Sequence, residues 1–357
     1  MAIQGPPSDW TVLHHKCLLV VKRLRAIITA VRKDGSVLVK KVCLSIFALI
    51  RLAPVLASQP SPEMLRRLFE EEWQRSKQKY GPDDIRTAQA ARDIGLFLVG
   101  QGDASGARDA LAETVRIDEK VLGPTAAQTL AVVTELARVS APQQAEPLWQ
   151  RAAESSDPNV AARALAFLGQ LREIAGDRAE SAKFYRRALV KEEQSSGQES
   201  AQVAIRLNAL SRVVDLPEAI ALLDRAVAIS RRRLGASHAE TATLELSLAG
   251  LLLKAGRADQ AAQSGGDALS IFEKTLGANH PRTALAATAL AHTLRAKGDA
   301  GGAERLYRRA LAIDEQAYGA KAPRTVSDAR TLADFLRGIG KRREAAELEK
   351  RLLTGAH

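Results

Sequence analysis

Two groups of histidines and the two cysteines are the side chains most able to do chemistry in this chain. His14, His15 and Cys17 are spaced closely enough to share a metal ion, but the rest of a coordination set is missing. Cys17 and Cys43 both lie near the N-terminus, so the remaining chain has no thiol for a disulfide, a nucleophile or a thiolate metal site. The sequence therefore predicts no metal site and no cofactor.

The second group of histidines, His238 and His280, recurs at equivalent places in the chain. One interpretation makes them ligands or bases, and the other makes them caps of turns between repeated segments. Their recurrence with a structural period favours the capping interpretation.

Acidic residues recur in the same way, as Asp118 and Glu119 and again as Asp314 and Glu315. Because they occupy one repeat position, we expect these carboxylates to lie on a solvated helix face. The sequence has no Gly-rich phosphate loop, no nucleophile elbow and no His-Glu-x-x-His metal motif. We therefore predict that the protein is not an enzyme.

His238, His280 and the two pairs of acids belong to a repeat with a period of 42 residues. A glycine opens each unit and a threonine follows six residues later. The glycines are Gly81, Gly123, Gly235, Gly277 and Gly319, and the threonines are Thr87, Thr129, Thr241, Thr283 and Thr325. A fixed period of this length indicates a helical solenoid, in which each unit buries its apolar face only against its neighbours.

The composition agrees with closely packed helices. Of the 357 residues, 46% are hydrophobic but only 4% are aromatic, so alanine and leucine must fill the core. The net charge of +11 is uneven, because residues 1–57 hold nine of the 52 basic residues and two of the 41 acidic ones. The remaining 300 residues are only mildly basic and contain no basic run with interleaved aromatics, so we expect no nucleic-acid binding.

The N-terminal 57 residues contain the pattern of a secretory signal peptide. Lys40 and Lys41 precede a short apolar stretch that ends in small residues, which predicts a signal at about 39–57 and cleavage after Ala57. This predicts a periplasmic or secreted protein. Arg51 interrupts the apolar stretch, and some 39 residues precede the basic pair. The alternative is an amphipathic segment, residues 11–56, that anchors the chain to a membrane or packs on the repeats.

Within a unit, the signals for helix ends predict a pair of helices. In the sixth unit Pro281 suits the first turn of a helix, and Gly298 can take the left-handed conformation that ends one. Asp299 can cap the second helix, which we expect over about residues 300–318.

The residues that the two helices share across units resemble the tetratricopeptide repeat. Its pattern has a leucine and a small residue in the first helix, as in Leu290 and Ala291. The second helix has an alanine, an aromatic and another alanine, as in Ala303, Tyr307 and Ala310. The resemblance covers roughly residues 61–355. It implies an all-α fold, a right-handed superhelical solenoid of antiparallel helix pairs.

The turn between units resembles the kinesin light chain subtype, whose repeats have 42 residues. The segment Gly277-Ala-Asn-His280-Pro281-Arg-Thr283 matches it best. We expect a linker and a lone capping helix at 58–80, followed by about seven helix pairs at 81–355. The middle pairs are shorter, since Thr129 and Thr241 are 112 residues apart.

The resemblance also implies that several positions of each first helix face a concave groove. Transferred by register, the candidate groove residues are Arg92, Arg138, Asn208, Arg212, Lys254, His292, Arg295, Arg330 and Arg337. The acids at these positions are Glu173, Asp215 and Asp334. A groove richer in basic than in acidic side chains suits an acidic extended peptide, whereas the alternative is scattered solubilising charge. We therefore expect a protein–protein interaction scaffold. The alternative is a membrane-anchored subunit that organises an envelope complex.

Overall fold

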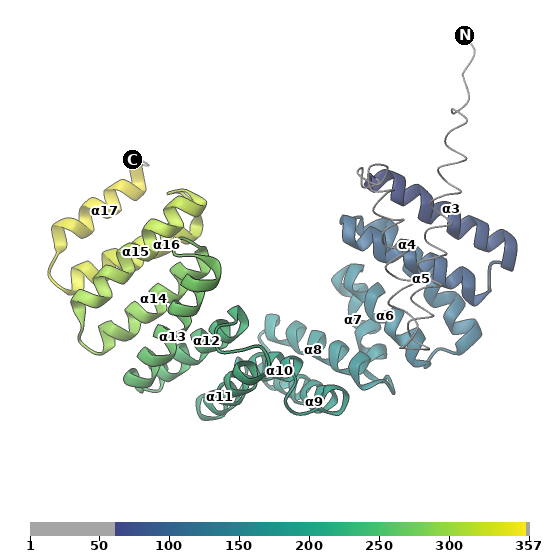
Figure 1. Ribbon diagram of the computed structural model, residues 1–357, viewed down its shortest axis with the longest axis horizontal. Coiled ribbons are helices and arrows are strands. Elements are labelled where there is room, and N and C mark those ends of the chain that lie inside the picture. The colour runs from purple at the N-terminus through teal and green to yellow at the C-terminus, as the bar shows by residue number, and fades with distance from the viewer. Residues whose placement is uncertain (1–60, 355–357) are drawn as a thin grey trace, which may run out of the picture. The chain divides into compact units, whose positions relative to one another are not determined.

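The structure, a computed structural model, describes residues 61–354, and every regular element in that range is a helix (Figure 1). The first eight helices are α3 (Pro62–Tyr80), α4 (Ile85–Gln101), α5 (Ala104–Leu122), α6 (Ala127–Val139), α7 (Pro142–Ala153), α8 (Pro158–Ile174), α9 (Arg178–Ser196) and α10 (Ala201–Ser211). The others are α11 (Leu216–Arg233), α12 (Ala239–Lys254), α13 (Ala258–Leu276), α14 (Pro281–Ala296), α15 (Ala300–Tyr318), α16 (Pro323–Gly338) and α17 (Arg342–Thr354). The expected all-α solenoid is confirmed.

Residue contacts divide the chain into two units, 1–65 and 66–357, and the helix array belongs to the second. Within that unit each helix packs on the next one in the chain, from α4 through α17 (Figure 1). After α3 the helices form pairs, beginning with α4 and α5. The first helices of neighbouring pairs also touch, α4 with α6, α6 with α8 and α12 with α14. The first helices of the pairs therefore share one side of the array.

The expectations for the N-terminal segment concern residues that lie outside the described range. These are the signal peptide at 39–57, the anchor at 11–56 and the cluster of His14, His15 and Cys17. In the part that is described, no helix is long and apolar enough to cross a membrane.

Local side-chain chemistry sets the helix ends. Gly298 has a φ of 83°, in the left-handed region that favours glycine, and terminates the first helix of its pair. Asp299 then caps α15, because its Oδ1 accepts from the Gly302 amide at 2.8 Å. Asp103 caps α5 in the same way through the Gly106 amide at 2.9 Å.

The recurring glycine and threonine are joined by a hydrogen bond. The Thr283 hydroxyl donates to the Gly277 carbonyl at 2.8 Å. The equivalent bonds have lengths of 2.7 Å for Thr87, 2.9 Å for Thr129 and 2.9 Å for Thr241. Thr325 differs, since its hydroxyl donates to the Asp314 carbonyl at 3.2 Å. The side chain thus adds a hydrogen bond to a carbonyl at the helix end, which in the turns of Gly123, Gly235 and Gly277 also accepts from a backbone amide at 3.2 to 3.4 Å.

His238 and His280 cap helices, as the capping interpretation predicted. Nδ1 of His238 accepts from the Glu240 amide at 3.1 Å, and Nδ1 of His280 accepts from the Arg282 amide at 3.0 Å. In each case the ring takes the place of the usual Ser, Asp or Asn at the start of a helix.

Small residues let the two helices of a pair approach closely. Ala291 and Ala303 are fully buried. Gly169 on α8 lies against the ring of Tyr185 on α9, where an added Cβ would be 2.7 Å from Cδ1. A larger side chain at such a contact would force the helices apart.

The expectation that the paired acids all lie on a solvated face was wrong for the aspartates. Asp118 and Asp314 are buried, at 1% and 0% exposure. Asp314 on α15 bonds to Arg324 on α16, the first helix of the next pair, and Asp118 occupies the equivalent position on α5. Only their neighbours Glu119 and Glu315 reach the surface.

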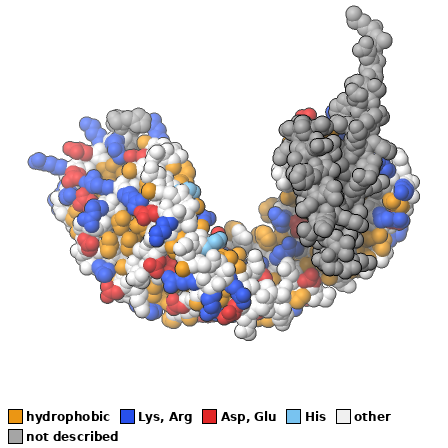
Figure 2. All heavy atoms as spheres, viewed as in Figure 1, with side chains coloured by type: hydrophobic (Ala, Val, Ile, Leu, Met, Phe, Trp, Pro, Cys, Tyr) orange, Lys and Arg blue, Asp and Glu red, His pale blue; other side chains and the backbone are white. Residues whose placement is uncertain are grey.

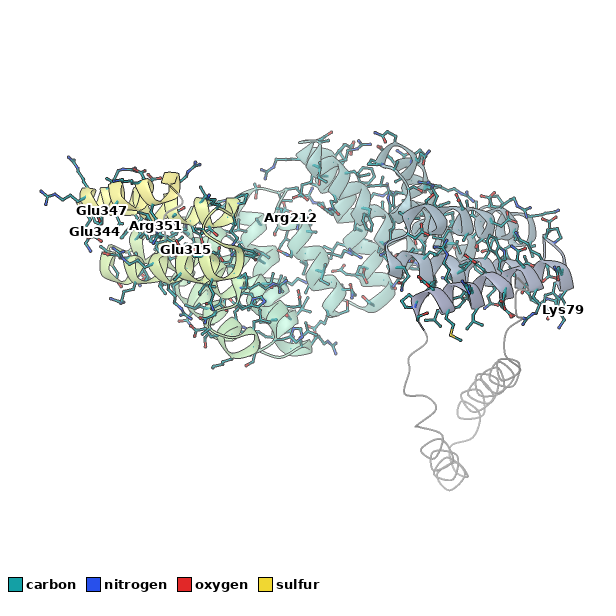
Figure 3. All side chains as sticks on the ribbon, turned by 90° about the horizontal axis from the view of Figure 1, so that it is seen from above. Lys79, Arg212, Glu315, Glu344, Glu347 and Arg351 are labelled. Carbon is teal, nitrogen blue, oxygen red and sulfur yellow. The ribbon has the colours of Figure 1, made fainter. Side chains whose placement is uncertain are left out.

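Those glutamates belong to a set of ion pairs that links a second helix to the next second helix at four places in the array. Glu315 on α15 and Arg351 on α17 lie side by side, with Oε1 and Nη2 2.5 Å apart (Figure 3). Equivalent pairs join Glu119 to Arg151, Glu193 to Arg225 and Glu273 to Arg309, at 2.5 to 2.6 Å. Arg151, Arg225 and Arg309 also donate to backbone carbonyls in the turn of the preceding unit. These interactions hold the turn of one unit against the second helix of the next.

Candidate functional site

The nine candidate groove residues lie on the first helix of a pair or at its end, in α4, α6, α10, α12, α14 and α16. Arg92, Asn208 and His292 are half-buried. The six others are exposed: Arg138, Arg212, Lys254, Arg295, Arg330 and Arg337. The six exposed residues are all cations, and their ion pairs divide them into cations that a carboxylate of the described residues neutralises and cations that none of these does.

Two exposed arginines are neutralised by nearby carboxylates. The Arg138 guanidinium lies 2.8 Å from the Glu135 carboxylate. Arg337 binds Asp334 at 2.6 Å and also binds Glu349 on α17. Because their charge is matched within the chain, these two arginines add little positive potential for a partner.

Arg212 is held more tightly, in a cluster between α8, α9 and the end of α10. Its Nε and Nη2 bind the two carboxylate oxygens of Glu173 at 2.8 and 2.9 Å. The Tyr185 hydroxyl donates to the same carboxylate at 2.7 Å. The Arg212 guanidinium holds the pKa of Glu173 below its usual value, while burial and the bond to Glu173 raise the pKa of Tyr185 to about 12. The cluster stays charged and intact at neutral pH.

Lys254, Arg295 and Arg330 carry the unmatched charge of the candidate groove. They are exposed on α12, α14 and α16, and no carboxylate of the described residues is within ion-pairing distance of them. Elsewhere on the described surface, basic and acidic side chains are interspersed (Figure 2). Arg92, on α4, is also unpaired, but its Nε is buried without a hydrogen-bond partner.

His292 is coupled to Tyr307, a contact that the sequence did not reveal. Nδ1 of His292 lies 2.7 Å from the Tyr307 hydroxyl, and the rings meet edge to face with centroids 5.2 Å apart. Burial, and then the charge of Arg295, lower the pKa of His292. The imidazole is therefore neutral at pH 7, so it offers a polar contact beside Arg295 rather than a cation.

An exposed aromatic on α8 was also missed. Phe167 is 39% exposed and stacks on buried Trp149, with ring centroids 4.3 Å apart and planes 10° from parallel. The only sequence signal was a phenylalanine in a helix otherwise rich in alanine and leucine.

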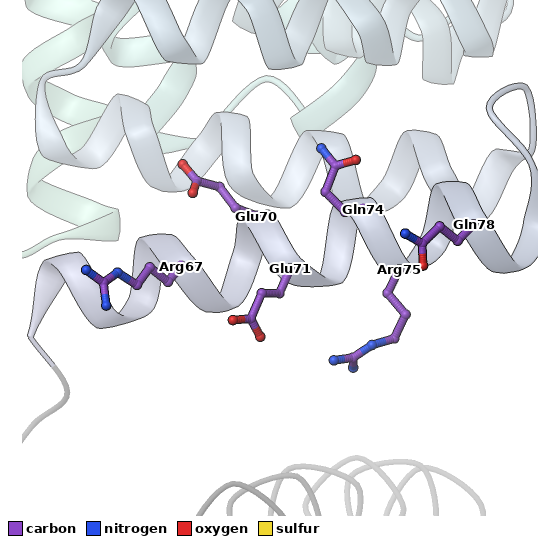
Figure 4. Close-up of a pocket in the computed structure, with 6 residues that line it drawn as sticks. All are labelled: Arg67, Glu70, Glu71, Gln74, Arg75 and Gln78. Carbon is purple, nitrogen blue, oxygen red and sulfur yellow. The ribbon is translucent and has the colours of Figure 1, made fainter. Parts of the chain in front are cut away.

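The hollows of the described part offer no built site for a small ligand. One lies along α3 and is lined by residues of that helix alone, all of them polar or charged (Figure 4). Another lies among α11, α12 and α13, where Arg231 already binds both Glu245, at 2.5 Å, and Asp267, at 2.9 Å. Among the described residues no group of three or more His, Cys, Asp or Glu side chains could hold a metal ion.

Comparisons with known proteins agree with this geometry. Family models of the tetratricopeptide repeat match residues 87–125, 208–274, 240–316 and 283–356, together more than half of the chain. A comparison with curated proteins gave no match.

Solved structures show the same fold. The TPR-like repeats of Podosopora anserina, assigned to a kinesin light chain, are 22% identical with a TM-score of 0.50. A variant of the same repeats is 21% identical with a TM-score of 0.51. Each match covers 56% of this chain and 96% of the solved one. The turns, the helix pairs and the matched models lead to one conclusion: the chain belongs to the tetratricopeptide repeat family.

Proposed function

We propose that the protein is an interaction scaffold whose first helices bind an acidic, extended segment of a partner protein. The contact would centre on α12, α14 and α16, the first helices of the last three pairs. Partner carboxylates would form ion pairs with the unmatched cations, while the half-buried, neutral His292 offers a polar contact between them.

The observation that carries this proposal is the difference between the two kinds of arginine. The chain neutralises Arg138, Arg212 and Arg337 with its own carboxylates. Within the described residues it leaves Lys254 and Arg295 without such partners on helices α12 and α14, which touch each other. Among the candidate groove residues, the exposed cations without a carboxylate partner in the described part fall on three successive first helices, α12, α14 and α16.

The proposal can be tested with a defined probe. A fluorescent Glu-rich peptide of about 12 residues should bind the protein, and its Gln-rich counterpart should not. Reversing Lys254 and Arg295 together to Glu should weaken peptide binding at least tenfold. Raising salt to physiological strength should weaken it too, because the Debye length shrinks to about 8 Å.

The control variant must not disturb the array. Arg308 and Arg309 are unsuitable, since they bind Glu344 and Glu273 on neighbouring second helices. Lys274 on α13 and Arg305 on α15 are exposed and have no ion pair among the described residues. If reversing Lys274 and Arg305 weakens peptide binding as much as reversing Lys254 and Arg295, binding depends on net charge and the proposed surface is wrong.

We also propose that the chain is exported and that its N-terminal segment is removed after Ala57. The support is the sequence pattern of residues 39–57. Mass spectrometry of the protein from its native host should find a mature N-terminus at Ser58. A chain that retains residues 40–56 would instead favour the membrane-anchored alternative.

A further inference from the structure

The structure places a buried residue at the same point of nearly every second helix, five residues before the turn glycine. These residues are Ser76, Asp118, Glu192, Ser230, Phe272 and Asp314. Each lies where one helix pair meets the next, so a polar member needs a partner from the following pair. The Glu192 carboxylate binds Arg206 at 3.2 Å, and the Ser230 hydroxyl lies 2.8 Å from that of Thr241.

Asp314 has only half of the partners that its carboxylate needs. Its Oδ2 accepts from Nε of Arg324 on α16 at 2.5 Å. Its Oδ1 is buried and accepts no hydrogen bond from any donor of the described residues. Arg324 also donates to the Pro281 carbonyl at 2.8 Å, so one guanidinium joins α14, α15 and α16.

A second carboxyl group, that of Asp328, follows Arg324 by one turn on α16, on the helix face whose Arg324 and Thr325 bond to Asp314. Two carboxylates therefore share the single charge of Arg324. Burial, and next the charge of Asp314, raise the pKa of Asp328 to about 6, while Arg324 acts in the opposite direction. From α14 the cluster receives only the Pro281 carbonyl, which Arg324 already binds. The charged groups acting on Asp328 in the described part of the chain are Asp314 and Arg324.

We propose that Asp328 and Asp314 share a proton across the contact between α15 and α16, and that loss of this proton loosens the last helix pair. In the protonated form Asp328 donates an O–H bond to Oδ1 of Asp314, which satisfies the buried oxygen. In the ionised form two anions face each other with one arginine between them. The docking of α16 and α17 on α14 and α15 therefore weakens as pH rises from 5 to 7.5.

The direction follows from proton linkage. The folded state holds the proton on Asp328 at pH values where the unfolded chain has lost it, because the folded pKa is the higher one. Stability from this pair is therefore largest below the ordinary aspartate range and is lost as pH rises through about 6. The proposal concerns the junction itself and does not depend on the identity of any partner.

The shared proton can be observed directly in the wild-type protein. Carbon-13 NMR of the aspartate carboxyls should show Asp328 titrating near pH 6, and Asp328→Asn assigns the signal by removing it. Titration of Asp328 near pH 4, like an exposed aspartate, would overturn the proposal.

The effect on the helices is measured by amide hydrogen exchange at pH 5 and 7.5. The protection of each amide is its intrinsic exchange rate at that pH divided by its observed exchange rate. In the wild-type protein the protection of α16 and α17 amides should fall about tenfold with this rise in pH, relative to those of α12 and α13. Asp328→Asn keeps a hydrogen-bond donor without a charge, so its protection should be high at both pH values. Glu347→Gln, an exposed acid on α17, is the matched control and should behave as wild type (Figure 3). Equal protection of wild-type α16 at the two pH values would contradict the proposed coupling.

Discussion

Arg212 binds both carboxylate oxygens of Glu173, a residue 39 positions earlier in the chain, at 2.8 and 2.9 Å. The pair connects the end of α10 to the end of α8, so it joins the first helices of two successive units. A planar guanidinium that binds both oxygens of a carboxylate is held in a more definite position than one that makes a single hydrogen bond. The sequence suggested Arg212 as a partner contact, whereas the structure gives it an internal role.

This role predicts coupling between the two residues. Glu173→Gln and Arg212→Lys should each lower the free energy of unfolding by about 1 kcal/mol, because the pair is partly solvated. The double variant should lose less than the two single losses together, as measured by urea denaturation. The exposed pair of Lys183 and Glu180 serves as the control and should show little coupling. Strict additivity at Glu173 and Arg212 would mean that the contact does not stabilise the fold.

The same pair gives a pH dependence of known sign. The pKa of Glu173 is lowered in the folded state, chiefly by the hydrogen bonds from Arg212. Its contribution is present above the ordinary glutamate pKa and is lost as pH falls through the folded value. The difference in unfolding free energy between wild type and Glu173→Gln should therefore shrink between pH 6 and pH 3. A difference that stays constant over this range would exclude the carboxylate as its source.

Overpacking tests the close helix contacts. Ala291→Leu and Ala303→Leu should each lower the free energy of unfolding by about 1–3 kcal/mol, because both alanines are fully buried. Ala296→Leu should have little effect, since Ala296 is exposed at the end of α14. The three urea midpoints give the comparison, and equal midpoints would refute the helix register.

The hydrogen bond between threonine and glycine should also be measurable. Thr283→Val keeps the shape of the side chain but removes the donor to the Gly277 carbonyl, which retains only the bond from the His280 amide at 3.3 Å, so the free energy of unfolding should fall by about 1 kcal/mol. Thr331→Val removes a bond within α16 that is exposed to solvent, and thermal unfolding should be almost unchanged. Similar losses for both variants would show that the turn bond has no special importance.

The helix pairs could be predicted from the period, the turn glycines and the capping residues. A glycine or a cap determines where a helix ends from the few residues around it, and the period repeats that information along the chain. Burial of Asp118 and Asp314 could not be predicted in this way. Their neighbours Glu119 and Glu315 have the same charge, and only the direction of each side chain toward the next pair separates core from surface.

The candidate groove shows a similar limit. A repeat register can assign Arg212 and Lys254 to comparable positions of their helices, and both side chains are exposed. It cannot tell that Glu173 neutralises Arg212, while Lys254 has no ion pair with any carboxylate in residues 61–354. Ion pairs between residues 30 to 40 positions apart depend on the separation of side chains across units, which the period does not specify.

The last prediction concerns Asp118, whose buried carboxylate has no hydrogen-bond partner on either oxygen among the described residues. Burial raises its pKa, and the charge of Arg92 only partly opposes this effect. Asp118→Asn should therefore raise the free energy of unfolding at pH 7.5 by about 1 kcal/mol, because an uncompensated buried charge destabilises the folded state. Urea denaturation at several pH values measures the change.

The pH dependence makes this prediction specific to the carboxylate. A raised folded pKa means that wild-type Asp118 gains its proton as pH falls, so the advantage of Asp118→Asn should shrink toward pH 4. Asp109, an exposed aspartate on the same helix, gives the control variant Asp109→Asn, which should change little at either pH. A loss of stability in Asp118→Asn at pH 7.5 would mean that the charged form of Asp118 is the one that the junction between the first two helix pairs requires.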